Sequence, residues 1–262
     1  MNGFDEFDFF FRNTGSALEI IGSLSSSYFH RFPELESFVM ATGVRCADEN
    51  WAWINSKNYS RELLIEVIKF FEDRSLQFIW PVFPGSGVQM GLDMDELGLL
   101  TRENFSAMTF DAVADSYVIE LADIELDVKS VLTSEDAMLW ADTNWKGFTE
   151  RGETPPEFVR FARYAALNNK LRLFFGYVEN EPAGTCMLCK CEGIVISHFS
   201  VLPKWRNMGV GSALMNEIMA YNNSVKNRFL VLIATKQGKK LYKKYGFRNI
   251  ADISIRSFSD SV

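Results

Sequence analysis

A short turn with two glycines, between a strand-like run and a helix-like run, constrains the fold of this chain more than any other feature. It reads Val-Leu-Pro-Lys-Trp-Arg-Asn-Met-Gly-Val-Gly-Ser over residues 201–212. The first N–H groups of a helix have no partner inside the helix, and the helix dipole favours negative charge there. Gly209 and Gly211 would let phosphate oxygens approach the main chain, while Arg206 can add a charge-assisted bond and Ser212 a hydroxyl. The turn therefore predicts a phosphate-binding site.

Other glycine-rich phosphate motifs do not fit this turn. A dinucleotide-binding fingerprint needs a third glycine at position 214, where this chain has Leu214. A P-loop needs a Gly-Lys-Ser/Thr sequence, which does not follow here. An ordinary glycine turn before a helix is the remaining alternative, and the surrounding elements must decide between the two interpretations.

The elements around the turn follow a regular order. We expect three strands joined by tight turns, a helix, a buried strand, a second helix and a last strand at the edge of the sheet. In chain order these are Leu171–Val178, Ala183–Lys190, Ile194–Val201, Gly209–Asn222, Phe229–Ala234, Gln237–Tyr245 and Asn249–Ile255.

The residues before this region predict a mixture of helices and strands. In chain order they are a helix over Ser60–Phe71, a strand over Phe78–Phe83, a helix over Val88–Leu100 that ends at Gly98, a linker and new strand within Val118–Val131, and helices beginning at Thr133 or Ser134 and at Pro155.

The charge of the chain is unevenly distributed. The net charge is −7, whereas a protein that binds duplex nucleic acid is normally basic, so we expect no nucleic-acid partner. Yet residues 204–248 contain ten Lys or Arg and one acid, Glu217. This stretch suits an anion, and the acidic remainder weakly favours a cationic partner. A solvated basic helix face is the alternative interpretation.

The sequence gives no sign of a membrane segment, a secretory signal or a disulfide framework. No apolar run approaches the roughly 18 to 20 residues that span a bilayer, and the first residues are acidic rather than basic. We expect a cytoplasmic protein with reduced thiols. The cysteines at 186, 189 and 191 alternate along a strand and lack a fourth ligand, so we predict no metal site and regard them as core residues.

A second motif follows the turn by about 25 residues. It reads A-T-x-x-G-x-x-L-Y-x-x-x-G-F and consists of Ala234, Thr235, Gly238, Leu241, Tyr242, Gly246 and Phe247. Together with R-x-x-G-x-G at 206–211 it resembles the GNAT family of acyl-CoA N-acyltransferases, over residues 170–255 and in outline from 126. The resemblance implies an α/β (α+β) fold with a mixed, mainly antiparallel sheet flanked by helices, and acetyl-CoA as cosubstrate.

The first half of the chain repeats this order of elements weakly. Phe78–Phe83, a helix and Leu97-Gly98-Leu99 echo Phe229–Ala234, a helix and Tyr245-Gly246-Phe247. We therefore expect a tandem protein, with a degenerate GNAT-like domain over 1–120 and the acetyltransferase domain over 121–262. Residues 75–101 contain no Lys or Arg, so only the C-terminal copy is expected to hold phosphates.

The resemblance also implies roles for individual residues. The backbone of 199–201 would pair with the pantetheine arm, an N–H near Val201 would polarise the thioester carbonyl, and 206–212 would hold the pyrophosphate. The cofactor-binding residues are then Phe199, Ser200, Val201, Arg206, Asn207, Met208, Gly209, Val210, Gly211, Ser212, Thr235 and Gly238.

Two side chains are candidates for proton transfer. Tyr242 matches the family position that protonates the leaving thiolate, which a phenol with pKa of about 10 can do at neutral pH; core packing is the alternative. His198, on the cofactor strand, is the candidate base that deprotonates the amine. Glu192 is a weaker candidate, and water acting on an amine of lowered pKa is another.

The sequence thus predicts direct transfer of acetyl to a primary amine in a ternary complex. The acceptor is either a small molecule or a peptide, and a homodimer is left open. An acyl-CoA sensor without turnover is the alternative, and a scaffold whose basic stretch binds acidic proteins is a third interpretation.

Overall fold

A computed structural model describes residues 5–24, 27–32, 36–115, 117, 126–150 and 152–259 of the 262. The first half contains α1 (Glu6–Gly22), β1 (Tyr28–Phe32), β2 (Ser37–Ala41), β3 (Asn50–Trp53), α2 (Arg61–Glu72), β4 (Trp80–Val82), α3 (Val88–Glu96) and β5 (Leu99–Asp111), with short 3-10 turns at Ala47–Glu49 and Ser56–Asn58.

The second half contains β6 (Leu126–Ser130), α4 (Ser134–Thr149), α5 (Pro156–Leu167), β7 (Leu171–Val178), β8 (Glu181–Lys190), β9 (Ile194–Val201), a 3-10 turn at Pro203–Trp205, α6 (Val210–Ser224), β10 (Phe229–Ala234), α7 (Lys239–Lys244) and β11 (Arg248–Phe258). The predicted bounds of β7, β9 and β10 are confirmed. The predicted linker falls largely within 118–125, outside the described residues.

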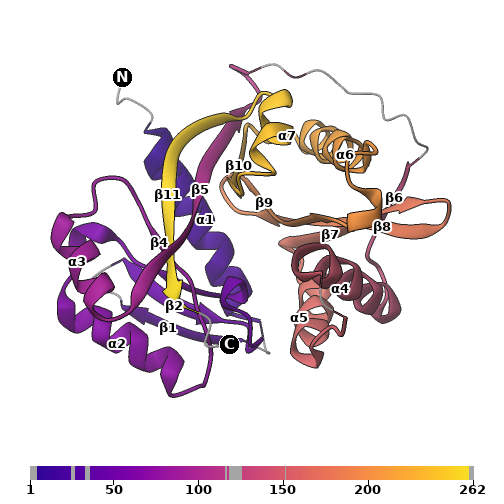
Figure 1. Ribbon diagram of the computed structural model, residues 1–262. Helices are drawn as coiled ribbons and strands as arrows, with labels where there is room; N and C mark the ends of the chain where they lie inside the picture. The colour runs from indigo at the N-terminus through magenta and orange to yellow at the C-terminus, as the bar shows by residue number, and fades with distance from the viewer. Residues whose placement is uncertain are drawn as a thin grey trace.

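Two sheets organise the molecule. β1, β2 and β3 form a three-stranded antiparallel sheet, and the other strands form one sheet in the order β4-β11-β5-β10-β9-β8-β7-β6. α4 and α5 cover one face of the C-terminal strands and α6 covers the other (Figure 1). The expectation of a mixed, mainly antiparallel sheet flanked by helices is confirmed, because β9 and β10 are the parallel pair of the large sheet.

The large sheet is shared between the two halves of the chain. β5, from the first half, pairs with β10 on one side and with β11 on the other. β11 also pairs with β4, so the prediction that the last strand lies at the edge of the sheet was wrong. The strand partners of β11 are at least 139 residues away in sequence, and local patterning carries no information about them. The division of the chain at residue 120 stays a prediction.

The pairing of these strands follows an approximate twofold pattern. The order β4-α3-β5 in the first half repeats as β10-α7-β11 in the second. If β4 is exchanged with β10 and β5 with β11, the sheet order β4-β11-β5-β10 becomes the same order read in reverse. Trp51 and Ile79 form a parallel bridge between β3 and the start of β4, as β9 and β10 pair in parallel. The repeat seen weakly in the sequence is therefore present in three dimensions.

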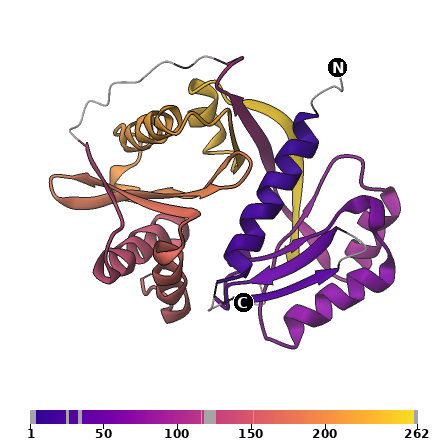
Figure 2. The same cartoon turned by 180° about the vertical axis from the view of Figure 1, so that it is seen from behind.

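Helix α1 packs against both halves of the chain, and no sequence pattern had predicted it. Asp5 caps the helix by accepting from the N–H groups of Phe7 and Asp8. Its buried face includes Phe9 and Phe10, and the helix contacts β2 and β5 of the first half and β9 and β10 of the second (Figure 2). One hydrophobic core consequently extends from α1 to α4 and α5.

Candidate functional site

The strands β9 and β10 separate partway along their length. They pair from Ile194–Leu230 to Ile196–Leu232, while β9 continues to Val201 and β10 to Ala234. The other side of β9 stays paired with β8 as far as Val201, opposite Gly184. Beyond Ile196, the edge of β9 that faces β10 has no strand partner among the described residues. Such an edge can pair with an extended ligand.

The predicted phosphate turn lies directly after this opening. Asn207 and Gly209 have positive φ angles of 61° and 87°, which reverse the chain before α6, and Gly209 adopts its angle without steric strain. The first intrahelical bond runs from Ala213 N–H to Gly209 C=O at 2.9 Å. The N–H groups of Val210 and Gly211 precede it and have no partner within the helix. The local geometry thus suits an anion at the N-terminus of a 15-residue helix.

Arg206 is engaged within the protein. Its guanidinium donates to the carbonyls of Val201 (3.2 Å) and Gly147 (2.7 Å) and to Glu150 (2.6 Å). These bonds fasten the turn to the C-terminal end of α4. A direct bond from Arg206 to phosphate stays a prediction, and it would compete with Glu150.

Tyr242 lies on helix α7 and packs against β9. Its ring packs edge-to-face on Phe199 of β9, with centroids 5.8 Å apart, and the side chain is buried. Burial raises the pKa of Tyr242 above its ordinary value, with a smaller contribution from nearby Cys186. The phenol is therefore protonated at neutral pH. Thr235 Oγ1 accepts from Gly238 N–H at 3.1 Å, and a Cβ on Gly238 would lie 3.1 Å from the Tyr242 ring.

Alternate residues of β9 face opposite sides of the sheet. Phe199 packs near Tyr242, and a Cβ on Gly211 would lie 3.9 Å from Phe199 and 4.0 Å from Val201. Ser200 is buried on the other side, where its hydroxyl lies 3.0 Å from that of Thr185 and 3.4 Å from the amide nitrogen of Asn144 on α4. The strand is thus held from the α4 side, and its backbone edge borders the opening.

His198 lies at a bulge of β9. Its φ of 48° is unusual for a residue with a Cβ, and the β8–β9 register shifts between Thr185 and Met187. The bulge turns the imidazole onto Phe161, 5.3 Å between ring centroids, and toward the first half of the chain. There, Nε2 lies 3.6 Å from the carboxylate of Glu49, and both side chains are 14% exposed. Sequence reasoning missed Glu49, since no local pattern relates it to a residue almost 150 positions away.

About half of the basic residues of 204–248 are paired with acids. Five form ion pairs within the structure: Lys204 with Glu181, Arg206 with Glu150, Arg228 with Asp111, Lys239 with Asp252, and Arg248 with Glu6 and Asp115. Lys236, Lys240 and Lys243 have no ion-pair partner among the described residues and lie on or beside α7. Five basic residues of this stretch therefore neutralise acids, whereas three lysines at α7 are not neutralised by an ion pair within the described part of the chain.

The helix of the first half that corresponds to α6 in the order of elements is α2. After β3, helix α2 begins at Arg61, whose guanidinium binds Asp93 (3.0 Å) and Glu96 (2.9 Å) on α3. Tyr59 and Gln89 also donate to Asp93 and hold its pKa below the ordinary value. Arg61, the first residue of α2, is thus already paired with acids of α3. The expectation that only the C-terminal copy holds phosphates stays a prediction.

Neither a metal cluster nor a membrane span is evident in the described ranges. No group of three His, Cys, Asp or Glu side chains is arranged to hold a metal ion there. No helix in that part of the chain is long and apolar enough to cross a membrane. The absence of a metal from the mechanism stays a prediction.

Comparisons with known proteins agree with this geometry. Residues 169–249 match the model of the acetyltransferase (GNAT) domain. Among solved structures, a GCN5-related N-acetyltransferase from Kribbella flavida is similar, with a TM-score of 0.65, 10% identity and 95% of each chain covered. A tandem GNAT protein from the clavulanic acid biosynthesis pathway has a TM-score of 0.58 and 10% identity over 96% of this chain and 95% of that one. No curated protein sequence matches the chain.

A GNAT domain is therefore present at residues 169–249 of the chain. The similarity to the two solved structures extends over nearly the whole chain and shows the fold. It is consistent with a degenerate GNAT-like copy in the N-terminal half, as the pairing of β4, β11, β5 and β10 indicates.

Replacement of Gly211 by Val tests the phosphate turn. A Cβ at this position would already lie 3.2 Å from Leu241, and the larger side chain would cover the amides of the turn. We expect the affinity for CoA to fall at least about tenfold, or ~1.4 kcal/mol, by calorimetry. Ala220→Val, on an exposed position of the same helix, should bind normally. Normal affinity of a folded Gly211→Val variant would exclude this turn as the site.

Proposed function

We propose that the protein is an acetyl-CoA-dependent N-acetyltransferase, which transfers acetyl directly to a primary amine in a ternary complex. The observation that carries the proposal is the opening between β9 and β10 beside the start of α6, where the N–H groups of Val210 and Gly211 have no partner within the helix. An unpaired strand edge accepts an extended chain with amide groups, and a helix N-terminus accepts phosphate. CoA carries both groups in one molecule, and the match over residues 169–249 supports this class of ligand.

The residues around the opening fit acetyl-CoA. The backbone of Phe199–Val201 would bind the pantetheine arm, residues 206–212 the pyrophosphate, and Lys236 or Lys240 a further phosphate. Thr235 and Gly238 would border the thiol end beside Tyr242. When bound, acetyl-CoA supplies an activated acyl group as a thioester. An N–H of β9 near Val201 would donate to the acyl oxygen as negative charge develops there.

Tyr242 is the proposed acid. Because burial keeps its phenol protonated, it can donate a proton to a sulfur that carries negative charge. No hydrogen bond from its hydroxyl occurs among the described residues, so the proton is not committed to a protein acceptor. The Tyr242 ring packs on Phe199 of β9 from the α7 side of the sheet.

His198 is the proposed base, on the opposite side of the sheet. Stacking on Phe161 and the 3.6 Å approach of Glu49 fix the imidazole in one orientation. Glu49 touches neither CoA nor the amine in this proposal; it is a positioning residue that orients the imidazole. Acid and base therefore act from the two faces of the opening between β9 and β10.

The two halves have separate tasks in this proposal. Residues 121–262 bind acetyl-CoA and carry out transfer, whereas residues 1–120 supply β5 to the sheet and Glu49 to the acceptor side. Glu49 brings negative charge to that side, which favours a cationic amine, either a small molecule or a peptide amine. Its neighbour Asp48 is paired with Arg102.

Turnover separates this proposal from an acyl-CoA sensor. Incubation of the full chain with acetyl-CoA and a panel of diamines, amino acids, aminoglycosides and peptides should release free CoA, detected with a thiol reagent. The corresponding acylated amine should appear by mass spectrometry. Tight acetyl-CoA binding without CoA release on any amine would support the sensor, and no CoA affinity at all would support the scaffold.

Loss of the Tyr242 hydroxyl should slow the reaction without weakening cofactor binding. For Tyr242→Phe we expect kcat to fall roughly ten- to a thousand-fold, because no donor remains for the leaving sulfur. The Kd for CoA should change little. Tyr221→Phe, at the far end of α6, is the matched control and should keep full activity. An unchanged kcat for Tyr242→Phe would remove Tyr242 from the mechanism.

The pairing of His198 with Glu49 can be measured by a double-mutant cycle. We expect His198→Asn to lower kcat by about 100-fold and Glu49→Gln by about tenfold, with unchanged affinity for CoA. The double variant should be no slower than His198→Asn, because Glu49 acts only through the imidazole. Glu192→Gln, which replaces the weaker candidate base, should have normal kcat. Additive losses in the double variant would exclude the proposed relationship.

A further inference from the structure

Two cysteine sulfurs lie close together at the end of β8, away from the proposed active site. The Sγ atoms of Cys189 and Cys191 are 3.7 Å apart. Side chains two residues apart in a regular strand are separated by about 6.6 Å, twice the rise per residue. The sulfurs approach one another because the chain leaves the strand at Lys190, where Cys191 N–H bonds to the carbonyl of Gly193 (2.8 Å).

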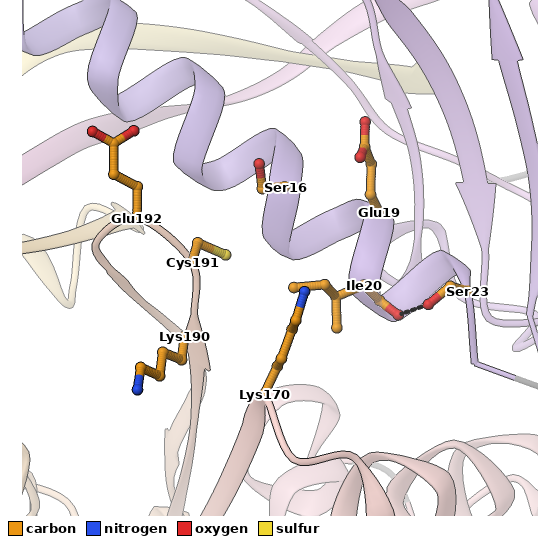
Figure 3. A pocket seen from close by; sticks show the side chains of 8 residues that line it. All are labelled: Ser16, Glu19, Ile20, Ser23, Lys170, Lys190, Cys191 and Glu192. Atoms are coloured by element: carbon orange, nitrogen blue, oxygen red, sulfur yellow. Dashed lines mark hydrogen bonds between the residues drawn. The ribbon is translucent and has the colours of Figure 1, made fainter.

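The two thiols differ in their access to solvent. Cys189 is completely buried in the core shared with α1, whereas Cys191 is only partly buried. Cys191 lines a cavity of about 480 Å³ between α1 and the β8–β9 turn, together with Lys170 and Lys190 (Figure 3). Its sulfur points into the space toward α1 (Figure 3). A small reagent can therefore reach Cys191 first, with Cys189 behind it.

The surroundings also make Cys191 the more acidic thiol. The hydrogen bond with Cys189 lowers the pKa of Cys191, Lys170 lowers it further, and burial and Glu19 oppose them. The same hydrogen bond and burial raise the pKa of Cys189. By contrast, burial and the nearby Glu49 and Asp48 raise the pKa of Cys46 to about 11. Reaction with an oxidant proceeds through the thiolate, so Cys191 is the reactive cysteine of the four.

We propose that Cys191 and Cys189 form a site of reversible thiol oxidation, in which a hydroperoxide converts the pair into an intramolecular disulfide. The Cys191 thiolate attacks one oxygen of the hydroperoxide; the O–O bond breaks, and an alcohol or water leaves. Cys191 is then a sulfenic acid. The Cys189 thiol attacks that sulfur, and water leaves with the Cys189 proton. The hydroperoxide gains two electrons, and the two thiols lose two.

The cysteine pair lies beside the contact between α1 and the C-terminal half of the chain. In the same turn, Gly193 N–H donates to the buried Asn13 of α1 at 2.7 Å. A Cβ on Gly193 would lie 3.1 Å from the ring of Phe9 and 2.9 Å from the carbonyl of Phe229. The new disulfide link, five bonds from one Cα atom to the other, would thus close beside a tightly packed contact between the halves, without touching the opening at β9 and β10.

Tryptic mapping tests the proposal directly, because Lys190 separates the two cysteines. Full-length protein is treated with hydrogen peroxide, alkylated and digested, with cleavage after Arg172, Lys190 and Lys204. The oxidised protein should be lighter by about 2 Da. Peptides 173–190 and 191–204 should stay linked until a reductant is added. Fragmentation should assign the bond to Cys189 rather than Cys186.

Single variants assign the two roles. Cys189→Ser should stop at the Cys191 sulfenic acid, which a 1,3-dione reagent traps, and Cys191→Ser should give neither product. Cys46→Ser is the matched control and should behave like the unmodified chain. Cys191 should react at least about tenfold faster than Cys46. Linked peptides in folded Cys191→Ser, or unlinked peptides in peroxide-treated wild type, would overturn the proposal, whatever the outcome of the acetyl-transfer assays.

Discussion

The pairing of β5 with both β10 and β11 is the interaction on which the rest of the structure depends. β10 forms one side of the opening at the candidate site, and its outer neighbour is a strand of the first half of the chain. β11 completes the fold of the first half by lying between β4 and β5. Each half therefore supplies a strand that the other needs. The geometry of the site is consequently a property of the whole chain, although the GNAT match covers only residues 169–249.

The two copies have the same order of elements but different chemistry at the equivalent helix. In the C-terminal half, α6 begins with glycines, and its first amides precede any intrahelical bond. In the first half, Arg61 at the start of α2 is bound to Asp93 and Glu96. The N–H group of Leu63 in the first turn of α2 already donates to the side chain of Ser60, whereas α6 has no side-chain cap. This difference supports the proposal that a single copy binds CoA.

The bulge at His198 links the two halves on the side opposite α7. A regular strand would place residues 198 and 200 on the same face and give no reason for a left-handed backbone conformation. The bulge instead directs the imidazole onto Phe161 and toward Glu49. Strained backbone that persists in a folded protein is over-determined by its surroundings, and it is often associated with function. The aromatic rings of α5 and the carboxylate of the first half supply those surroundings here.

Local sequence patterns determined the elements of the C-terminal half. The strands Leu171–Val178, Ile194–Val201 and Phe229–Ala234 were predictable to the residue, because periodicity and glycine placement are local properties. The helix predicted over Gly209–Asn222 is observed over Val210–Ser224. The resemblance to the GNAT family rests on the same kind of short-range spacing. Only the tertiary structure decided that β11 is internal, that Arg206 binds α4, that Glu49 meets His198, and that Cys189 and Cys191 approach one another. The place of β11, the contact of Arg206 with α4 and the contact of Glu49 with His198 depend on segments that are distant in the sequence. The approach of the two cysteines depends on where β8 ends. Hydrophobic periodicity fixes which face of an element is buried, but not which element covers it.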